Sequence, residues 1–235
     1  MKIGVLGYRG RMGKALQSVA AEASVELVEL LPDTQIGALD ALIDFSSPSG
    51  LLEVAQRISD SPLPLVSGTT GLSQDEHTKL ASLVKNRPFL HAANFSVGVN
   101  VLEHLVELAA KATRGFDIEV FEAHHRHKVD APGGTAIFLA EAAARARELD
   151  LQSVAEWGRH GQVGPRSEDE IGFQVVRGGS IVGEHTVFFA GEGERLELTH
   201  RAQDRTIFAR GALRAARWLV DKPTGNYSMR DVLFS

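Results

Sequence analysis

The chain has 235 residues, enough for one large domain or two modest ones, and its hydrophobic content of 43% suffices for a buried core. It contains no cysteine, which excludes disulfides and cysteine-ligated zinc and favours a cytoplasmic protein. The formal net charge of −5 argues against a non-specific nucleic-acid binder, which needs the opposite sign. We predict neither a signal peptide nor a membrane-spanning segment.

The first part of the chain alternates short apolar runs with helical patterns. One predicted helix begins at Ser73, where Glu76 three residues later completes a capping box. Such alternation is typical of a parallel sheet with helical crossovers. The predicted strands are residues 2–6, 25–31, 39–45, 63–67 and 89–92, and the earlier helices are residues 14–22 and 51–58.

The pattern changes after residue 96. Residues 99–111 are predicted as a helix, residues 116–123 as a strand, and residues 134–149 as a strong helix. Residues 151–169 are polar and contain several glycines, so we predict a long loop. Three strands follow without intervening helices, which indicates an antiparallel or mixed sheet. These strands are residues 171–177, 184–190 and 195–200, and a last helix is predicted over residues 206–219.

These elements predict an α/β fold with two domains. Residues 1–95 form an N-terminal domain with a Rossmann-like parallel sheet. Residues 96–205 form a C-terminal α+β domain with a mixed or antiparallel sheet. From its pattern alone, the last helix can pack on either domain.

Three glycines, Gly7, Gly10 and Gly13, lie between the first predicted strand and the first predicted helix. In a dinucleotide-binding fold, the first glycine makes a tight turn and the second lets the pyrophosphate approach the backbone, while the third lets the helix pack closely on the sheet. The spacing differs by one residue from the commonest G-x-G-x-x-G form, and a glycine trio can also be a simple turn. The position directly after a first strand favours nucleotide binding.

An acidic residue near the end of the second strand would bind the adenosine ribose of such a nucleotide. Glu29 and Asp33 are the candidates. The alternative is that Glu29 is a solvent-facing strand residue and that Asp33 forms a turn after Pro32. No arginine is next to Asp33, so a site for a 2′-phosphate is not evident there, although Arg9 or Arg11 can supply the charge.

Two further loops follow strands of the same predicted sheet. Ligands bind outside the carboxyl ends of parallel strands, so the Gly68-Thr69-Thr70 loop is placed to contact a nicotinamide or its ribose. The alternative is a turn whose threonine hydroxyls bond the local backbone. The Ala93-Asn94-Phe95-Ser96 segment follows the fifth strand at the domain boundary and is a candidate cofactor contact, a hinge, or both.

The run His124-His125-Arg126-His127-Lys128 places three imidazoles, a guanidinium and an ammonium in consecutive residues, just before a turn and a helix. So many positive and proton-donating groups need an anion nearby. The N–H groups of Gly134 and Thr135, at the start of the predicted helix, add donors and a favourable dipole. We therefore predict an anion-binding acid–base site whose missing anion is a substrate.

Two other interpretations of this histidine-rich run are weaker. As a metal site, His125 and His127 would share one strand face, but Arg126 and Lys128 would repel the ion and no set of acidic ligands is close by in sequence. We expect no metal. As a solvated patch, the run would have no chemical role. Two histidines of the later strands are interpreted as core-edge or sheet-face residues rather than catalytic ones: His185 and His200.

With these residues in place, the chain closely resembles the dihydrodipicolinate reductases, also called 4-hydroxy-tetrahydrodipicolinate reductases, over nearly its whole length. The histidine-rich run is the most specific part of the resemblance, and the glycine loop alone would not suffice. The matching segments are residues 7–13, 44–46, 68–71, 92–100, 122–136, 183–186 and 227–233.

The resemblance implies an oxidoreductase of lysine and diaminopimelate biosynthesis that reduces a cyclic dicarboxylate with NADH or NADPH. It implies His124 as a proton donor or acceptor and Lys128 as a proton donor. It also implies contacts to a substrate carboxylate from His125, Gly134 and Thr135.

The resemblance further implies that residues 206–235 complete the nucleotide domain and that the sheets of residues 96–205 assemble a homotetramer. We expect no nucleic-acid or membrane partner. Residues implied in cofactor binding are Gly7, Tyr8, Arg9, Gly10, Arg11, Met12, Gly68, Thr69, Thr70, Ala92, Ala93, Asn94 and Phe95, with Asp33 as a candidate for the ribose.

The chain departs from the family at two places. Gly133 stands where the family commonly has serine, which removes one hydroxyl contact. The stretch of residues 32–38 is short, which removes the loop that usually recognises the ribose and leaves the choice between NADH and NADPH open. Two other functions are considered: another nicotinamide-dependent reductase of small imino or amino acids, or a nucleotide-sensing protein without catalysis. Neither requires the histidine-rich run.

Overall fold

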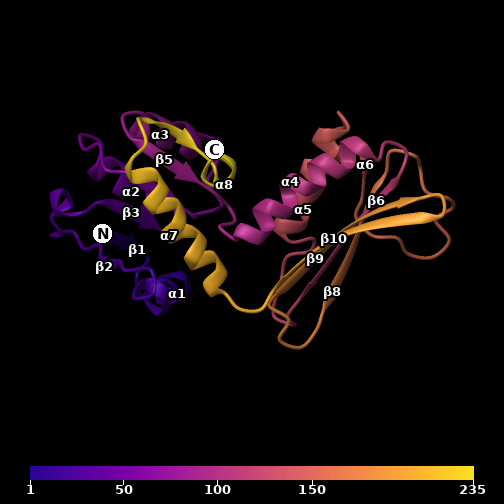
Figure 1. Ribbon diagram of the computed structural model, residues 1–235, viewed down its shortest axis with the longest axis horizontal. Coiled ribbons are helices and arrows are strands. Elements are labelled where there is room, and N and C mark those ends of the chain that lie inside the picture. Colours follow the sequence, from indigo (N-terminus) through magenta and orange to yellow (C-terminus); the bar gives the residue numbers. More distant parts are fainter. The chain divides into compact units, whose positions relative to one another are not determined.

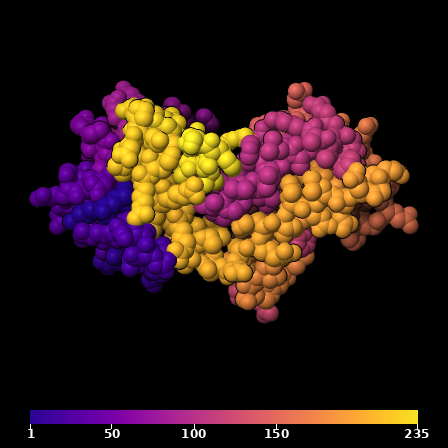
Figure 2. Space-filling model, in the orientation of Figure 1, coloured from indigo at the N-terminus to yellow at the C-terminus, as the bar shows by residue number.

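A computed structural model describes residues 1–235 and contains two compact units (Figure 1). The first unit comprises Met1–Val97 and Arg205–Ser235, and the second unit comprises Gly98–Asp204. The end of the chain therefore folds with its beginning, and Figure 2 shows the yellow C-terminal residues packed among the indigo and purple N-terminal ones. None of the helices combines the length and the apolar character that crossing a membrane requires.

The first unit is built on a six-stranded sheet in which all neighbouring strands are parallel. Its inner strands are apolar and largely buried, as expected for a parallel sheet that is covered on both faces. The strand order is β11 (Gly225–Tyr227), β5 (Pro88–His91), β4 (Leu65–Ser67), β3 (Ala41–Asp44), β1 (Lys2–Leu6) and β2 (Glu26–Glu29).

Helices cover both faces of this sheet and form two separate cores. Successive side chains of a strand point to opposite faces, so Ile43 of β3 enters one core and Leu42 enters the other. A 3-10 turn, Ile36–Ala38, precedes β3. The helices on the Ile43 side are α1 (Arg11–Ala20), α7 (Thr206–Val220) and α8 (Met229–Phe234), and those on the Leu42 side are α2 (Pro48–Arg57) and α3 (Gln74–Val84).

The second unit contains a five-stranded mixed sheet. Its central strand, β6, pairs in parallel with β8 and antiparallel with β9. Ile118 and Val120 of β6 face a core that they share with the alanine-rich helix α5. The strand order is β10 (Glu194–Ala202), β9 (Gly183–Gly191), β6 (Asp117–His124), β8 (Ile171–Arg177) and β7 (Ala155–Glu156), and the helices are α4 (Val97–Ala112), α5 (Gly134–Ala146) and α6 (Leu151–Val154).

The predicted fold class, a parallel Rossmann-like sheet followed by a mixed one, is confirmed. The helix predicted to begin at Ser73 has the expected capping box with Glu76. Other predicted elements are present with small shifts at their ends. Helix α1, for example, begins at Arg11 rather than at residue 14, because the glycine loop passes directly into the helix at Gly10.

The prediction of one long loop over residues 151–169 is wrong at its start, where α6 and β7 form. These elements have four and two residues, which is too short for a periodic pattern. Strand β7 exists because it pairs with β8, a partner distant in sequence. Strand β11 and helix α8 were not predicted, although Ser228 and Asp231 form a capping box at the start of α8.

Candidate active site

The glycine loop between β1 and α1 leaves the start of α1 open to a ligand. Gly7 has a φ of +82°, and a Cβ at Gly7 would lie 2.3 Å from the carbonyl oxygen of Phe45. A Cβ at Gly13 would lie 2.0 Å from the carbonyl oxygen of Tyr8, so both positions exclude larger residues. Gly10 is the N-cap of α1 and provides no side-chain hydrogen bond to it. The open N–H groups and the helix dipole suit a pyrophosphate.

Glu29, at the carboxyl end of β2, is held by Arg9 of the glycine loop. The Arg9 Nε atom lies 2.8 Å from Glu29 Oε1, and Arg9 Nη2 lies 3.1 Å from Oε2, so the contact uses both oxygens. The hydrogen bond to Glu29 raises the pKa of Arg9, whose side chain is 81% exposed. Of the two candidates for the ribose, Glu29 therefore contacts the glycine loop, whereas Asp33 lies exposed in the turn that follows β2.

A buried carboxylate organises the carboxyl ends of β3 and β4. Asp44 is 1% exposed, and the hydroxyls of Ser67 and Thr69 each donate to its Oδ2 atom at 2.7 Å. Ser46 donates to Oδ1 from its hydroxyl at 2.5 Å and from its N–H at 3.1 Å. These neutral donors fix the loop after β4. Asp44 was not among the residues predicted for the site, although an acid that ends a buried strand is a usable signal.

The two loops predicted to contact the nicotinamide lie side by side. The N–H of Ala92 donates to the carbonyl oxygen of Ser67 at 3.1 Å, and His91 Nε2 lies 2.7 Å from the carbonyl oxygen of Thr69. Strands β4 and β5 are neighbours, so the segments that follow them meet at one edge of the sheet. The structure therefore brings residues 68–70 and 92–95 together.

Phe95 belongs to the core of the first unit rather than to its surface. Its side chain is 2% exposed and packs edge-on against Phe45, with ring centroids 5.6 Å apart. A Cβ at Gly68 would lie 2.2 Å from the Phe45 ring, which explains the glycine at that position. A cofactor contact from Phe95 would therefore have to come from its backbone.

In the second unit, the histidine-rich run begins on β6 and continues into a turn. His124 ends the strand, and the N–H of Lys128 donates to the carbonyl oxygen of His125 at 3.1 Å. His125 and Lys128 are half-buried, whereas Arg126 and His127 are exposed. The expectation that His125 and His127 share one strand face is wrong, because the chain leaves the strand after His124.

The turn ends at α5, which begins at Gly134 as predicted. Gly133 is its N-cap and provides no side-chain hydrogen bond; Gly134 is exposed and Thr135 is half-buried. A Cβ at Gly133 would lie 2.7 Å from Glu122 Oε2 and 2.9 Å from Lys128 Nζ. A serine at this position would crowd both groups, so Gly133 lets the start of the helix approach them.

Glu122 lies at the centre of the charged groups of the second unit. It precedes His124 by two residues on β6 and faces the same side of the sheet, and β9 places His185 directly opposite it. Glu122 Oε2 lies 3.4 Å from His124 Nδ1 and 3.8 Å from His185 Nε2. Arg177 donates to Oε1 at 2.6 Å. His185 does lie on the sheet face, but the sequence did not show that this face is the one that carries His124.

Lys128 joins the same network through Asp130. Its Nζ atom donates to Asp130 Oδ2 at 2.6 Å, and Arg177 donates to the carbonyl oxygen of Asp130 at 2.6 Å. The bond from Lys128 is the main cause that lowers the pKa of the Asp130 carboxyl. The two candidate proton-transfer groups, His124 and Lys128, are thus connected through Arg177 and the acidic groups that it contacts.

Burial lowers the pKa values of both imidazoles beside Glu122. For His124, desolvation outweighs the opposing effect of the Glu122 carboxylate, and the nearby Lys128 and Arg177 lower the pKa further. For His185, burial lowers the pKa to about 3, so this imidazole is neutral at pH 7. The site therefore combines two cations, Lys128 and Arg177, with the imidazole of His124, which can exchange a proton.

Glu122, His124 and His185 also have the spacing of a metal site, with one atom of each lying within 4.8 Å of the others. However, Arg177 contacts Glu122 and the charge of Lys128 acts on both imidazoles, so a divalent cation would be repelled. These surroundings favour a shared proton over a divalent cation at this position.

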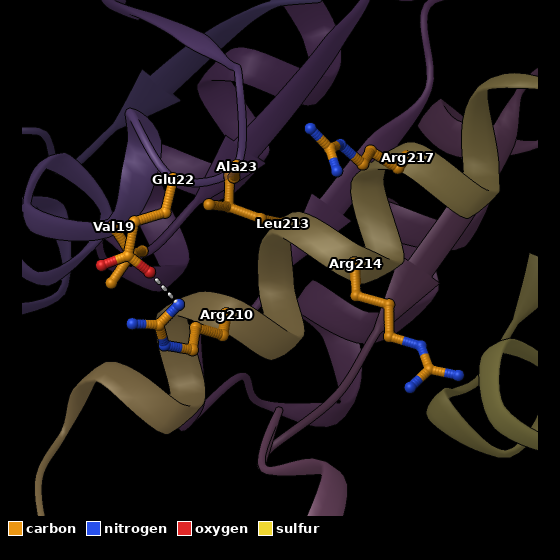
Figure 3. Close-up of a pocket in the computed structure, with 7 residues that line it drawn as sticks. All are labelled: Val19, Glu22, Ala23, Arg210, Leu213, Arg214 and Arg217. Carbon is orange, nitrogen blue, oxygen red and sulfur yellow. Dashed lines mark hydrogen bonds and ion pairs between the residues drawn. The ribbon is translucent and has the colours of Figure 1, made fainter.

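A pocket between α1 and α7 is lined by none of these residues. Figure 3 shows Arg210 paired with Glu22 across it, with an Nη1–Oε2 distance of 2.5 Å. Its lining contains none of the residues that the sequence indicated for the site. Each unit therefore carries its own candidate residues, at the helix start and loops described above.

Comparison with known proteins identifies a family. The family models described as dihydrodipicolinate reductase, N-terminus and C-terminus, match residues 32–95 and 98–233. A 4-hydroxy-tetrahydrodipicolinate reductase from Acinetobacter baumannii (strain AYE) is 44% identical over 261 residues, which cover 99% of this chain and 96% of that protein. A protein of the same name from Halorhodospira halophila is 51% identical over 199 residues, which cover 84% and 74%.

The fold has a matching solved structure. It is a dipicolinate-bound dihydrodipicolinate reductase from Paenisporosarcina sp. TG-14, with a TM-score of 0.79 and 22% identity. The match covers 97% of each chain. At this identity the likeness supports the fold, and the family rests on the sequence matches.

Proposed function

The chain belongs to the dihydrodipicolinate reductase family, and we propose that it reduces 4-hydroxy-tetrahydrodipicolinate to tetrahydrodipicolinate, with loss of water, in lysine and diaminopimelate biosynthesis. The observation that carries the proposal is the site of the second unit, where His124, Lys128 and the open start of α5 surround the buried Glu122. A ring with two carboxylates needs such a combination of positive charge, N–H donors and a proton source.

We assign NADH or NADPH to the first unit. The fit rests on the glycine loop, where Gly7 and Gly13 lie against the carbonyl oxygens of Phe45 and Tyr8 and the N-cap of α1, Gly10, leaves the helix start without a side-chain cap. In this proposal Gly7 to Met12 hold the pyrophosphate, and residues 68–70 and 92–95 line the nicotinamide end. Asp33, or the pair of Glu29 and Arg9, binds the adenosine ribose. When bound, the reduced nicotinamide supplies a hydride.

The substrate is assigned to the second unit. His125, the N–H of Gly134 and the N–H and hydroxyl of Thr135 bind one substrate carboxylate in this proposal, and the dipole of α5 favours the negative charge. The relative from Paenisporosarcina is described as dipicolinate-bound, and dipicolinate is a planar ring with two carboxylates. This agrees with a second unit built to bind a small dicarboxylate.

His124 and Lys128 are the proposed proton-transfer residues. The 4-hydroxyl group leaves as water together with a hydrogen of the neighbouring ring carbon, which gives a conjugated imine. Adding a hydride to this imine then requires a proton at the neighbouring ring position. Lys128 carries donor protons, and Asp130 holds its head in place. His124 is partly exposed at the end of β6, so it can reach a bound ring while Glu122 contacts its other side.

We further propose a homotetramer that assembles through the sheet of the second unit, and a cytoplasmic location. Strand β10 is an edge strand with Leu196 40% exposed, and such an edge is open to pairing with another chain. Light scattering after gel filtration would measure the assembly.

The decisive experiment follows nicotinamide absorbance with freshly made substrate, with NADH and NADPH compared. We expect Lys128→Ala to lower the turnover number by roughly 10²–10⁴-fold, because a positioned proton donor contributes about that much, while the affinity for NADH stays unchanged. Lys111→Ala, which removes a lysine paired with Glu107 on α4, is the matched control and should keep full activity.

Each outcome of this assay has a clear meaning. Wild-type activity only on another small imino or amino acid would replace the proposed substrate, and nucleotide binding without any turnover would indicate a sensing protein. An unchanged turnover number in Lys128→Ala would remove Lys128 from the chemistry.

A further inference from the structure

Three buried atoms face one another beside the end of β6 without a hydrogen bond. They are Glu122 Oε2, His124 Nδ1 and His185 Nε2. A buried polar atom that lacks a partner costs free energy, so its retention calls for a physical explanation. The separation of 3.4 Å between Glu122 Oε2 and His124 Nδ1 is short enough for a hydrogen bond to form after a small adjustment.

The register of the sheet places Glu122, His124 and His185 close together. Glu122 and His124 follow Ile118 and Val120 on the face of β6 that forms the core, so they continue a buried row towards the start of α5. Strand β9 places His185 opposite Glu122. The carboxylate is 1% exposed and cannot turn to water, and its unbonded oxygen lies against the two imidazoles.

We propose that Glu122 is the positioning residue of His124, an inference that rests on the proposed function. The Glu122 carboxylate accepts a hydrogen bond from Nδ1–H of His124, which fixes the ring and leaves Nε2 free to exchange a proton with substrate. A neutral imidazole carries one proton, so the partner of one nitrogen decides the state of the other. Arg177 donates a hydrogen bond to the second carboxylate oxygen and fixes the orientation of Glu122.

Glu122 is the one acidic group among the charged and titratable groups that act on His124. Lys128, Arg177 and His125 disfavour the protonated form of His124, whereas the negative charge of Glu122 favours it. The groups that face His124 are Glu122, Lys128, Arg177, His125 and His185.

The test replaces Glu122 by Gln, which keeps the shape and removes the charge. A glutamine NH₂ group facing Nδ1 would favour the tautomer with the proton on Nε2. We expect kcat to fall by about 100-fold or more while KM changes only a few-fold. In the pH profile of kcat/KM, the limb that reports His124 should move to lower pH, because loss of the carboxylate charge lowers the pKa of His124.

Two further variants distinguish a positioning role of Glu122 from a general disruption of the local structure. Glu122→Asp keeps the charge, so the limb should stay near its wild-type pH even if kcat falls. Glu119→Gln removes a carboxylate from the same strand, where it binds Arg159 instead, and should leave kcat and KM unchanged. Calorimetry with pyridine-2,6-dicarboxylate would show whether each variant retains its binding site.

A measurement without turnover tests the inference directly. Nitrogen-15 NMR of the imidazoles in the wild-type protein should show His124 protonated on Nδ1 at neutral pH. A neutral His124 protonated on Nε2 would overturn the assignment to Glu122, and so would a Glu122→Gln variant with wild-type kcat and pH profile. Inactive wild-type protein with the expected tautomer would instead count against the proposed function and leave the positioning intact.

Discussion

Two carboxylates, one in each unit, are equally buried but have opposite surroundings. Asp44 and Glu122 are both 1% exposed, and each lies at or near the carboxyl end of a strand. Asp44 accepts hydrogen bonds from hydroxyls and one backbone N–H, all of them neutral. Glu122 has one oxygen on Arg177 and the other against two imidazoles that it does not bond in the structure.

This difference separates a structural carboxylate from one suited to chemistry. Neutral hydroxyls do not change charge near pH 7, so the network around Asp44 holds a loop in one geometry. Imidazoles do change charge or tautomer, so the group around Glu122 can respond to a proton or a ligand. Perturbed pKa values gather where a site does chemistry, and in this molecule the shifted buried imidazoles lie on the sheet that carries Glu122.

The largest effect on stability is expected at Asp44. Asp44→Ala leaves the hydroxyls of Ser67 and Thr69 without their acceptor inside the first unit and removes the two hydrogen bonds that Ser46 donates to the carboxylate. We expect the free energy of unfolding to fall by about 3 kcal/mol, measured by urea denaturation. Asp60→Ala, at an exposed site, is the control and should change it by less than about 0.5 kcal/mol. A loss below about 1 kcal/mol would show that the buried Asp44 carboxylate contributes little to the stability of the first unit.

Much of the fold could be predicted because the signals are local. The alternation of strands and helices, the capping box at Ser73 and the start of α5 at Gly134 each depend on residues close in sequence. Short elements were not predicted because they lack such local signals. Strand β11, for example, has three residues and forms because it pairs with β5. Its existence depends on a distant neighbour rather than on its own composition.

The candidate site divides in the same way. The glycine loop and the histidine-rich run are contiguous, so the sequence shows them directly. The partners of those residues are not contiguous: β9 places His185 opposite Glu122, and β8 brings Arg177 to the same carboxylate. Only the strand order and register of the second sheet determine these contacts, and periodicity does not specify register between distant strands.

A smaller effect is expected from His185 in acid. Burial holds its folded pKa at about 3, whereas an unfolded histidine has a pKa near 6.5. Between these values the unfolded chain takes up a proton that the folded protein does not, so the stability from neutral His185 is complete above about pH 6.5 and is lost as the pH falls towards 3. At pH 5 the loss should be about 2 kcal/mol.

Replacing the imidazole by an amide should remove this pH dependence. Stability of the His185→Gln variant should fall less steeply between pH 7 and pH 5 than that of the wild type, as followed by urea denaturation at each pH. His160→Gln, an exposed site in the same unit, should keep the wild-type slope. Equal slopes in all three proteins would show that His185 does not resist protonation in the folded state.

The smallest effect on stability, and the sharpest on ligand choice, is expected at a third carboxylate, Glu29. Its pair with Arg9 lies at the surface, so neither Arg9→Ala nor Glu29→Gln should move the unfolding midpoint measurably. In this pair a cation neutralises an acid that would otherwise repel a 2′-phosphate. Arg9→Ala should therefore favour NADH, and Glu29→Gln should free the guanidinium and favour NADPH.

The readout is the ratio of the dissociation constants of NADPH and NADH, measured by fluorescence titration. We expect shifts of about five- to tenfold in opposite directions for the two variants, because each changes the local charge by one unit near the ribose. Both shifts should shrink in 0.5 M salt, where exposed charges are screened. Lys14→Ala removes an exposed charge from α1 and should weaken both nucleotides alike. Shifts in the same direction for Arg9→Ala and Glu29→Gln would show that the pair does not set the preference.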